Sequence, residues 1–258
     1  MFEESEFCLK FPSHQTALEL FSAGWQSAFP AGSGLIAGAV DHFNDGRVPW
    51  GANVLGGLAG KSILELGPYE AYNTLQFEKC GASSVVSIEA NTTNFFKCLC
   101  VKNIFNLKAT FLVGDFTTYM ESSKGRFDVC WASGVLYHME DPLRLLRAMT
   151  AVSDTLFIWT QYYDDVHISG SPNEEMFFPD RNKVVKGLGG EDIVLHYRSY
   201  VVSRTGYFSG GAEEYSYWMK KDDIIRYISD LGYVKITMGI DAPQYANGPA
   251  CFFIAQRE

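Results

Sequence analysis

Two acidic residues, Glu65 and Glu89, each lie at the end of a short apolar segment that is predicted to be a β-strand. The two carboxylates are 24 residues apart, a spacing typical of one strand–helix–strand unit. In such a unit the first turn faces a nucleotide, and an acid at the end of the second strand can accept hydrogen bonds from both ribose hydroxyls. The pair therefore predicts a nucleotide-type cofactor, without saying which one.

The turn after the first strand separates two classes of cofactor. It reads Gly-Pro-Tyr-Glu-Ala over residues 67–71. A dinucleotide site needs several glycines so that the backbone can approach a pyrophosphate, whereas here Pro68 removes a donor and Glu70 would repel phosphate. A turn lined by carboxylates suits a cofactor that has no phosphate and carries positive groups, such as S-adenosylmethionine (SAM). The alternatives are an NAD-dependent oxidoreductase, because Glu89 serves either ribose, and a non-catalytic ligand-binding protein.

Strand and helix patterns alternate along most of the chain. This order predicts an α/β fold with a doubly wound, mostly parallel seven-stranded sheet, helices on both faces and an antiparallel last strand. Strand ends of a parallel sheet share one rim, so the polar residues at these ends should converge. The predicted strands cover residues 62–66, 84–89, 110–113, 127–132, 156–160, 234–239 and 250–255.

The segments on either side of this pattern are expected to have separate tasks. Residues 1–60 are predicted to form a helical cover, with a helix from residue 13 to about Gly24 and then an aromatic turn at Trp25 and Phe29-Pro30. Residues 61–258 are predicted to form the cofactor-binding domain, interrupted at about 161–217 by an insertion that is rich in glycine and aromatic residues and also contains Arg204. Long segments of this kind often gate ligands, so we expect a substrate lid; a dimerisation element is the alternative.

Four short runs resemble the class I SAM-dependent methyltransferases. They are Glu65-Leu66-Gly67, Glu89, Gly114-Asp115 and Gly134-Val135-Leu136-Tyr137-His138. The resemblance covers roughly residues 60–160 and 218–256. The last run resembles a branch that includes the tRNA wobble-uridine carboxymethyltransferases and many small-molecule methyltransferases. The second and third glycines of the family's turn correspond to Tyr69 and Ala71, so we expect a turn of different shape.

This resemblance implies a SAM site in which each end of the cofactor has its own residues. Glu65 and Gly67 would line the methionine end, and Glu89 would accept hydrogen bonds from the ribose. The remaining implied or expected contacts are Asp115 with the adenine amino group, Phe116 against the ring, Ser133 and Gly134 below the sulfonium, and Pro68 and Ala90 beside the two acids. Trp50 or Trp25 could lie over the sulfonium by cation–π attraction.

Methyl transfer to an oxygen or nitrogen needs alignment of the acceptor, and a base only where the acceptor carries a proton. The candidate bases are His138 and His167, and Tyr137 is a further catalytic candidate. Tyr162 and Tyr163 are expected to face the substrate, because they directly follow the fifth predicted strand. Asp115 has the alternative task of capping the helix that follows it. The histidines and acids of the insertion match no compact ligand pattern, so no metal is predicted.

The charge balance limits the partners. Lys and Arg total 21 against 30 Asp and Glu, a formal net charge of −9, which disfavours nucleic acid. The expected substrate is a small, partly apolar molecule, and a homodimer is a further expectation. No run of about 18 apolar residues predicts a membrane span, and the acidic start favours the cytoplasm over secretion. The six cysteines are expected to be reduced thiols.

Overall fold

The computed structural model describes residues 7–21, 24–168, 174–200 and 211–257. Arg204 and parts of the expected cover and lid therefore lie outside the described residues. The chain divides into two compact units, Met1–Asp115 and Phe116–Glu258, and each is described by itself below. The boundaries expected near residues 60 and 161–217 stay predictions.

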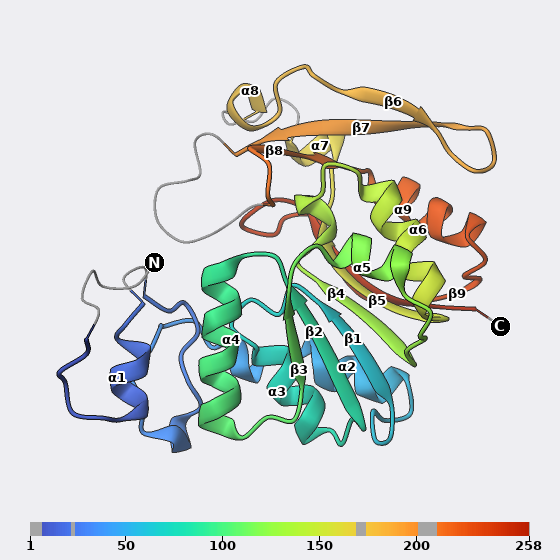
Figure 1. The fold of residues 1–258 in the computed structure, drawn as a ribbon. Coiled ribbons are helices and arrows are strands. Elements are labelled where there is room, and N and C mark those ends of the chain that lie inside the picture. Colours follow the sequence, from blue (N-terminus) through green and yellow to red (C-terminus); the bar gives the residue numbers. More distant parts are fainter. Residues whose placement is uncertain (1–6, 22–23, 169–173, 201–210, 258) are drawn as a thin grey trace. The chain divides into compact units, whose positions relative to one another are not determined.

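The first unit contains three parallel strands with helices beside them. The register pairs Glu65 of the first strand with Ser87 of the second, and Glu89 with Val113 of the third. In Figure 1, the longest helix of the unit runs alongside its third strand. In chain order the elements are α1 (His14–Leu18), η1 (Ala31–Ser33), η2 (His42–Asn44), α2 (Arg47–Val54), β1 (Ser62–Leu66), α3 (Tyr72–Lys79), β2 (Ser84–Glu89), α4 (Thr92–Phe105) and β3 (Thr110–Val113).

The second unit contains the other strands of the main sheet and a small separate sheet. Its elements are α5 (Phe116–Ser122), β4 (Val129–Ser133), η3 (Leu136–His138), α6 (Pro142–Val152), β5 (Thr155–Gln161), α7 (Asp165–Ile168), α8 (Glu174–Phe177), β6 (Lys183–Lys186), β7 (Asp192–Ser199), β8 (Tyr215–Trp218), α9 (Lys221–Asp230), β9 (Lys235–Ala242) and β10 (Ala250–Gln256).

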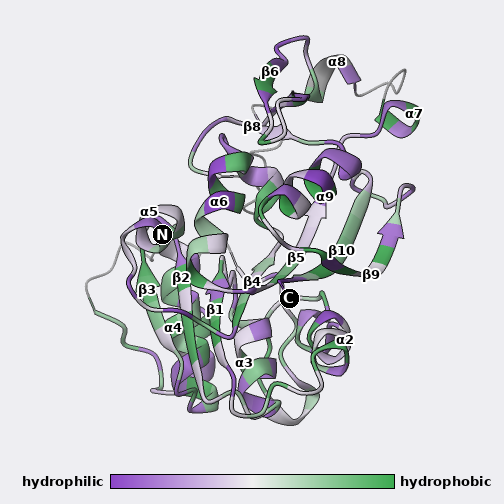
Figure 2. Ribbon diagram, turned by 90° about the vertical axis from the view of Figure 1, so that its right-hand side faces the viewer, coloured by the Kyte–Doolittle hydropathy of each residue, from purple (hydrophilic) through white to green (hydrophobic). Residues whose placement is uncertain are grey.

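The order of the main sheet confirms the predicted fold class. Its seven strands follow the order β3-β2-β1-β4-β5-β10-β9. β10 is antiparallel to both β5 and β9. The pairs β1–β2, β2–β3 and β4–β5 are parallel. β10 has strands on both sides, and six of its seven residues are buried. Its sequence is accordingly apolar along almost its whole length (Figure 2).

The insertion contains regular structure that the sequence pattern did not predict. β6, β7 and β8 form a three-stranded antiparallel sheet in that order, seen at the top of Figure 1. Within the second unit this sheet is joined to the chain after η3, because the Tyr217 N–H donates to the Met139 carbonyl over 2.9 Å. The expected function as a lid stays a prediction.

The helix expected from residue 13 to about Gly24 is shorter in the structure, because α1 contains only five residues. Trp25 and Phe29 of the predicted aromatic turn belong to a cluster of edge-on rings. Trp25 contacts Phe29 at 5.2 Å between ring centroids, and Phe29 contacts Phe43 at 5.4 Å.

Candidate functional site

The turn between β1 and α3 has an unusual backbone. Gly67, Tyr69 and Ala71 have φ angles of 64°, 57° and 57°. This left-handed region suits glycine, and a residue with a Cβ is disfavoured there by roughly 1–2 kcal/mol. We expected a turn of different shape because Tyr69 and Ala71 replace glycines. This reason is wrong, because both residues adopt the backbone conformation that glycine prefers.

Several contacts hold this turn in place. The Tyr69 N–H donates to Glu89 Oε2 over 3.0 Å, and the Tyr69 carbonyl accepts from the Cys98 thiol over 3.3 Å. The Ala71 N–H donates to the Pro68 carbonyl over 2.8 Å, and Ala71 is fully buried. The surrounding structure thus offsets the local strain, a pattern that is common at ligand sites.

Glu89 is held at the end of β2 by backbone donors. Its Oε1 accepts from the Asn91 N–H over 2.8 Å, and its Oε2 from Tyr69 as described above. The side chain is buried, and burial raises its pKa to about 7. Each carboxylate oxygen can accept more than one hydrogen bond, so the arrangement leaves acceptor capacity for a ligand hydroxyl.

Glu65 is more deeply buried and is only half satisfied. Its Oε2 accepts from the hydroxyls of Thr74 and, over 2.7 Å, of Ser87. Its Oε1 has no hydrogen-bond partner within the part of the chain that the structure describes. Burial, with a smaller contribution from the charge of Glu89, raises the pKa of Glu65 to about 7. An unpaired carboxylate oxygen at this place fits a ligand that carries N–H donors and positive charge, as SAM does.

Glu70 has a different task from the one that the sequence suggested. It is fully buried, and its Oε1 accepts from Lys97 Nζ over 2.8 Å. The N–H groups of Gln26 and Ser27 also donate to its carboxylate, over 3.1 and 2.7 Å. Our argument that Glu70 would repel a phosphate is therefore wrong, because its charge is compensated by these partners.

Lys97 also makes a cation–π contact with Trp25. Its ammonium lies 5.2 Å from the centroid of the Trp25 ring, and the indole N–H donates to the Leu18 carbonyl. Trp25 therefore makes its cation–π contact with a lysine of its own unit and anchors the aromatic cluster. The contact of Trp50 with the sulfonium stays a prediction; this residue lies partly buried on α2.

The other predicted cofactor residues lie at or just after the ends of β2, β3 and β4. Ala90 directly follows Glu89, and Asp115 follows β3 as an exposed residue after Gly114. Phe116 is buried at the start of α5. Ser133 is the last residue of β4 and is buried. Their roles, like those of Gly67 and Pro68, stay predictions.

Gly134 is constrained on two grounds. Its φ is 82°, and a Cβ at this position would lie 3.2 Å from the Trp159 ring. Its N–H donates to the Trp159 carbonyl over 3.0 Å. A residue with a side chain would be strained here and would also press against the indole, which explains the glycine before η3.

Tyr137 and His138 lie together on η3, with their ring centroids 4.0 Å apart. Tyr137 also contacts Trp159 and Trp218 edge-on, at 5.7 and 6.0 Å. His138 Nδ1 is 2.7 Å from the Tyr200 hydroxyl. Desolvation, assisted by the positive charge of Arg198, lowers the pKa of His138 to about 3. The imidazole is therefore neutral near neutral pH but accepts a proton reluctantly, so its function as a base stays a prediction.

The other two catalytic candidates each contact an acidic side chain. The Tyr162 hydroxyl donates to Asp241 Oδ1 over 2.7 Å, and burial raises its pKa above the usual range for a phenol. His167 Nδ1 lies 2.8 Å from Asp164 Oδ1 at the start of α7. Their catalytic function stays a prediction.

The sequence analysis assigned no function to the residues of β7 and β8 that contact η3. Tyr200, which follows β7, bonds to His138 and also donates to the Tyr137 carbonyl over 3.2 Å. Ser216 of β8 donates to the Tyr200 hydroxyl over 3.1 Å. The apolar run Ile193-Val194-Leu195, rich in β-branched residues, was the signal that could have revealed this strand.

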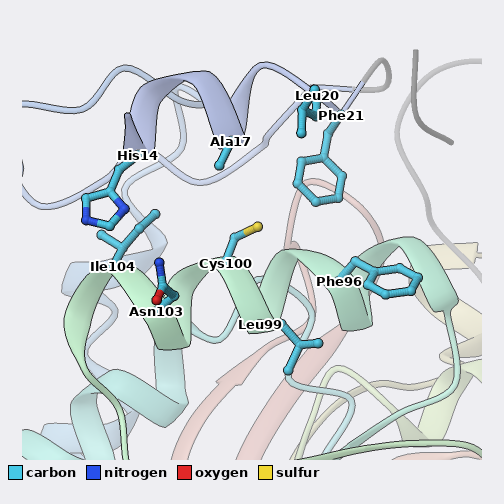
Figure 3. A pocket seen from close by; sticks show the side chains of 9 residues that line it. All are labelled: His14, Ala17, Leu20, Phe21, Phe96, Leu99, Cys100, Asn103 and Ile104. Atoms are coloured by element: carbon cyan, nitrogen blue, oxygen red, sulfur yellow. The ribbon is translucent and has the colours of Figure 1, made fainter. Parts of the chain in front are cut away.

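A groove in the first unit lies apart from the predicted site. It has a volume of about 300 Å³ between α1 and α4, and Figure 3 shows side chains of both helices turned toward it. None of the predicted cofactor residues lines it. Its lining consists of His14, Ala17, Leu20, Phe21, Phe96, Leu99, Cys100, Asn103 and Ile104.

Two further observations concern membrane-spanning helices and metal sites. Among the residues that the structure describes, no helix is long and apolar enough to cross a membrane. The same residues contain no group of three or more His, Cys, Asp or Glu side chains that could hold a metal ion.

Comparison with known proteins matches part of the chain to a family. Residues 64–154 match the family described as a methyltransferase domain. Over 93 residues the chain is 32% identical to the tRNA U34 carboxymethyltransferase of Dichelobacter nodosus, a match that covers 36% of this chain and 29% of that relative. The chain thus spans less than a third of the length of this curated relative.

Solved structures share the fold over most of the chain. The N-terminal domain of EvdMO1, crystallised with S-adenosylhomocysteine (SAH) and D-fucose, has a TM-score of 0.69 at 19% identity, with 95% of both chains covered. Magnesium protoporphyrin IX methyltransferase from Synechocystis, with bound SAH, has a TM-score of 0.52 at 15% identity, covering 82% of this chain and 80% of its own.

The matched segment and the shared fold are those of a class I, Rossmann-like methyltransferase domain, and they indicate SAM as the cofactor. The predicted fold is confirmed. The finer resemblance to the branch that contains the Gly134–His138 run stays a prediction.

Proposed function

We propose that this chain is a SAM-dependent methyltransferase that acts on an oxygen or nitrogen of a small, partly apolar molecule. The observation that carries the proposal is the pair of buried acids at neighbouring strand ends, Glu65 with its unpaired Oε1 and Glu89 with its remaining acceptor capacity. A carboxylate without a partner in a buried place is unfavourable unless a ligand supplies the missing donors.

The residues of the first unit would hold the cofactor. Glu65 would accept from the amino group at the methionine end, and Glu89 from the ribose hydroxyls. SAM, when bound, supplies a methyl group on a positively charged sulfur, which is already activated for transfer. The protein therefore has to align the acceptor and exclude water more than it has to activate the donor.

The residues around η3 in the second unit would position the acceptor. The bond between His138 and Tyr200 fixes the imidazole, and the Tyr137 ring is held between two indoles. A neutral imidazole in this place can exchange hydrogen bonds with an acceptor hydroxyl or amine. This arrangement is typical of positioning, and the depressed pKa of His138 disfavours strong base catalysis.

Measurements of ligand binding distinguish this proposal from two alternatives, an NAD-dependent oxidoreductase and a non-catalytic ligand-binding protein. Titration calorimetry with SAH, SAM and NADH should show binding of the first two compounds and none of NADH. Binding of NADH without SAM would overturn the proposal in favour of the oxidoreductase. Binding of SAM without methyl transfer to any acceptor would favour the non-catalytic ligand-binding protein.

The class of acceptor needs a separate measurement. EvdMO1 was crystallised with D-fucose, and the curated relative acts on tRNA; the net charge of −9 favours a small molecule over nucleic acid. Transfer of labelled methyl from SAM should therefore occur with phenols, amines or sugars and not with bulk tRNA. Labelling of tRNA alone would contradict the small-molecule assignment.

A further inference from the structure

One face of the small sheet in the second unit carries polar side chains that the proposed chemistry does not use. Successive side chains of a strand point to opposite faces, so His196, Arg198 and Tyr200 share one face of the chain at β7. The register places Trp218 opposite His196 and Ser216 opposite Arg198. This is also the face whose Tyr200 bonds to His138.

Arg198 is a half-buried cation surrounded by aromatic rings. Its guanidinium carbon lies 4.3 Å from the ring centroid of Phe177, 5.0 Å from that of Tyr200 and 5.9 Å from that of Trp218. Burial lowers its pKa. The rings attract the cation, but they do not accept N–H hydrogen bonds as an anion does.

No carboxylate pairs with Arg198 among the side chains that the structure describes. Within the described part of the chain its guanidinium makes one hydrogen bond, to the Ser199 carbonyl, although it carries five N–H donors. A desolvated positive charge without a counter-ion is unfavourable until an anion binds.

His196, two residues before Arg198, also has unused polar atoms. Its ring is buried and stacks on that of Tyr163, with centroids 3.5 Å apart. Both ring nitrogens are buried, and neither has a hydrogen-bond partner within the described part of the chain. Burial lowers its pKa to about 4, so the ring is neutral and offers one donor and one acceptor.

We propose that Arg198 and His196 bind an anionic oxygen group of the acceptor substrate, a carboxylate or a phosphate. The guanidinium would supply the charge and two parallel N–H donors, and the imidazole a third hydrogen bond. The apolar part of the substrate would pack on the aromatic rings that surround the guanidinium. The inference rests on the proposed methyltransferase function and narrows its substrate to small anions.

The opposite face of the same sheet provides a matched control. There Tyr197 and Tyr215 stack with their centroids 5.2 Å apart. Arg181 lies 5.5 Å from the centroid of the Tyr197 ring, and it is exposed. A variant at Arg181 therefore removes a positive charge and a cation–π contact from this sheet without touching the proposed site.

The test uses the full chain saturated with SAH and three probes of similar size: 4-hydroxybenzoate, phenyl phosphate and phenol. Calorimetry should show that at least one of the two anions binds about tenfold or more tightly than phenol. Arg198→Gln should abolish this preference, Arg198→Lys should retain part of it, and Arg181→Gln should leave it unchanged. His196→Phe, which retains the stacking, should weaken the anion several-fold. The ratio of the two anions separates a carboxylate from a phosphate.

Several outcomes would overturn the inference. They are equal binding of phenol and both anions to the wild type, no binding of any probe, or an anion preference that survives in Arg198→Gln. If Arg198→Gln does not fold, as judged by its melting curve, the wild-type preference and its partial reduction in Arg198→Lys and His196→Phe decide, and an unchanged preference in both variants overturns the inference. Failure of the wild type to bind SAH would instead overturn the proposed function, so the two failures are distinguishable.

Discussion

The backbone N–H of Tyr69 donates to the Glu89 carboxylate over 3.0 Å, and this bond joins the left-handed turn after β1 to the end of β2. The turn therefore holds the acid that we assign to the ribose, and the acid in return stabilises a residue with a φ of 57°. Changes to either residue should affect both cofactor binding and stability, and the experiments below separate these effects.

SAM affinity should rise with pH. In the free protein, burial raises the pKa of Glu65 and of Glu89 to about 7, from 4.5 for an exposed glutamate. The stability that these groups contribute is thus fully present below pH 4.5 and is lost as pH rises through about 7. A cation bound beside them lowers their pKa, so SAM should bind more tightly at about pH 8 than at about pH 6, with release of protons. Calorimetry in two buffers of different ionisation enthalpy measures both quantities, and an affinity that is flat or falls with pH would contradict the assignment.

Glu89→Ala should weaken SAM binding by about tenfold or more, because bonds to the ribose worth about 1.4 kcal/mol or more are lost. Glu78→Ala is the matched control, since Glu78 also accepts from two backbone N–H groups, those of Lys108 and Ala109, each over 2.7 Å. The control should lower the melting temperature but leave the SAM dissociation constant unchanged. Equal affinity of wild type and Glu89→Ala would remove Glu89 from the cofactor site.

Tyr69→Gly should be more stable than Tyr69→Ala. Both changes remove the ring, but only alanine has a Cβ that is disfavoured at this φ by about 1–2 kcal/mol; glycine gives back about 0.4–1 kcal/mol through the unfolded chain. Ala151→Gly in α6 should show the opposite sign, a loss of about 1 kcal/mol, because Ala151 lies in an ordinary helix. Urea unfolding compares the three variants, and a more stable Tyr69→Ala would show that the left-handed backbone is not retained.

Loss of Glu70 should destabilise the protein strongly. Glu70→Ala leaves the buried ammonium of Lys97 unpaired and removes the acceptor of two backbone N–H groups, which should cost about 3–5 kcal/mol. Lys97→Met should also be costly, and the double variant should lose less than the sum of the two single changes. The exposed pair of Lys10 and Glu19 serves as control, with an expected loss of about 1 kcal/mol or less. Additive losses at Glu70 and Lys97 would contradict the coupling.

Local sequence signals were sufficient for much of the fold. The helix α6 follows from such signals, because Asp141 caps it and Pro142 occupies its first position. The strands that end at Glu65 and Glu89 were also identified, because each combines an apolar run with a terminal acid. These are short-range patterns, in which the residues that decide the structure lie within one element.

Contacts between distant residues could not be predicted in this way. Glu70 bonds to Gln26 and Ser27, more than 40 residues earlier in the chain, and no local pattern indicates such a partner. The backbone at Tyr69 and Ala71 was also missed, because side-chain identity normally excludes that conformation and only the surrounding contacts enforce it. The pairing of His138 with Tyr200 depends on the small sheet of the insertion, whose strands the glycine- and aromatic-rich pattern concealed.

The attachment of Glu70 to residues 26 and 27 has a practical consequence for the boundaries of an expressed fragment. A chain shortened to begin near residue 30 would still contain Glu70, Lys97 and Trp50 but would lack two of the backbone donors to the Glu70 carboxylate. Water would have to enter a buried region of the intact protein, next to the turn that holds Glu89. The segment before residue 30 thus supplies hydrogen-bond donors to the first turn of the sheet, and removing it should lower cofactor affinity although Trp25 belongs to the aromatic cluster and its neighbours have no assigned contact with the cofactor.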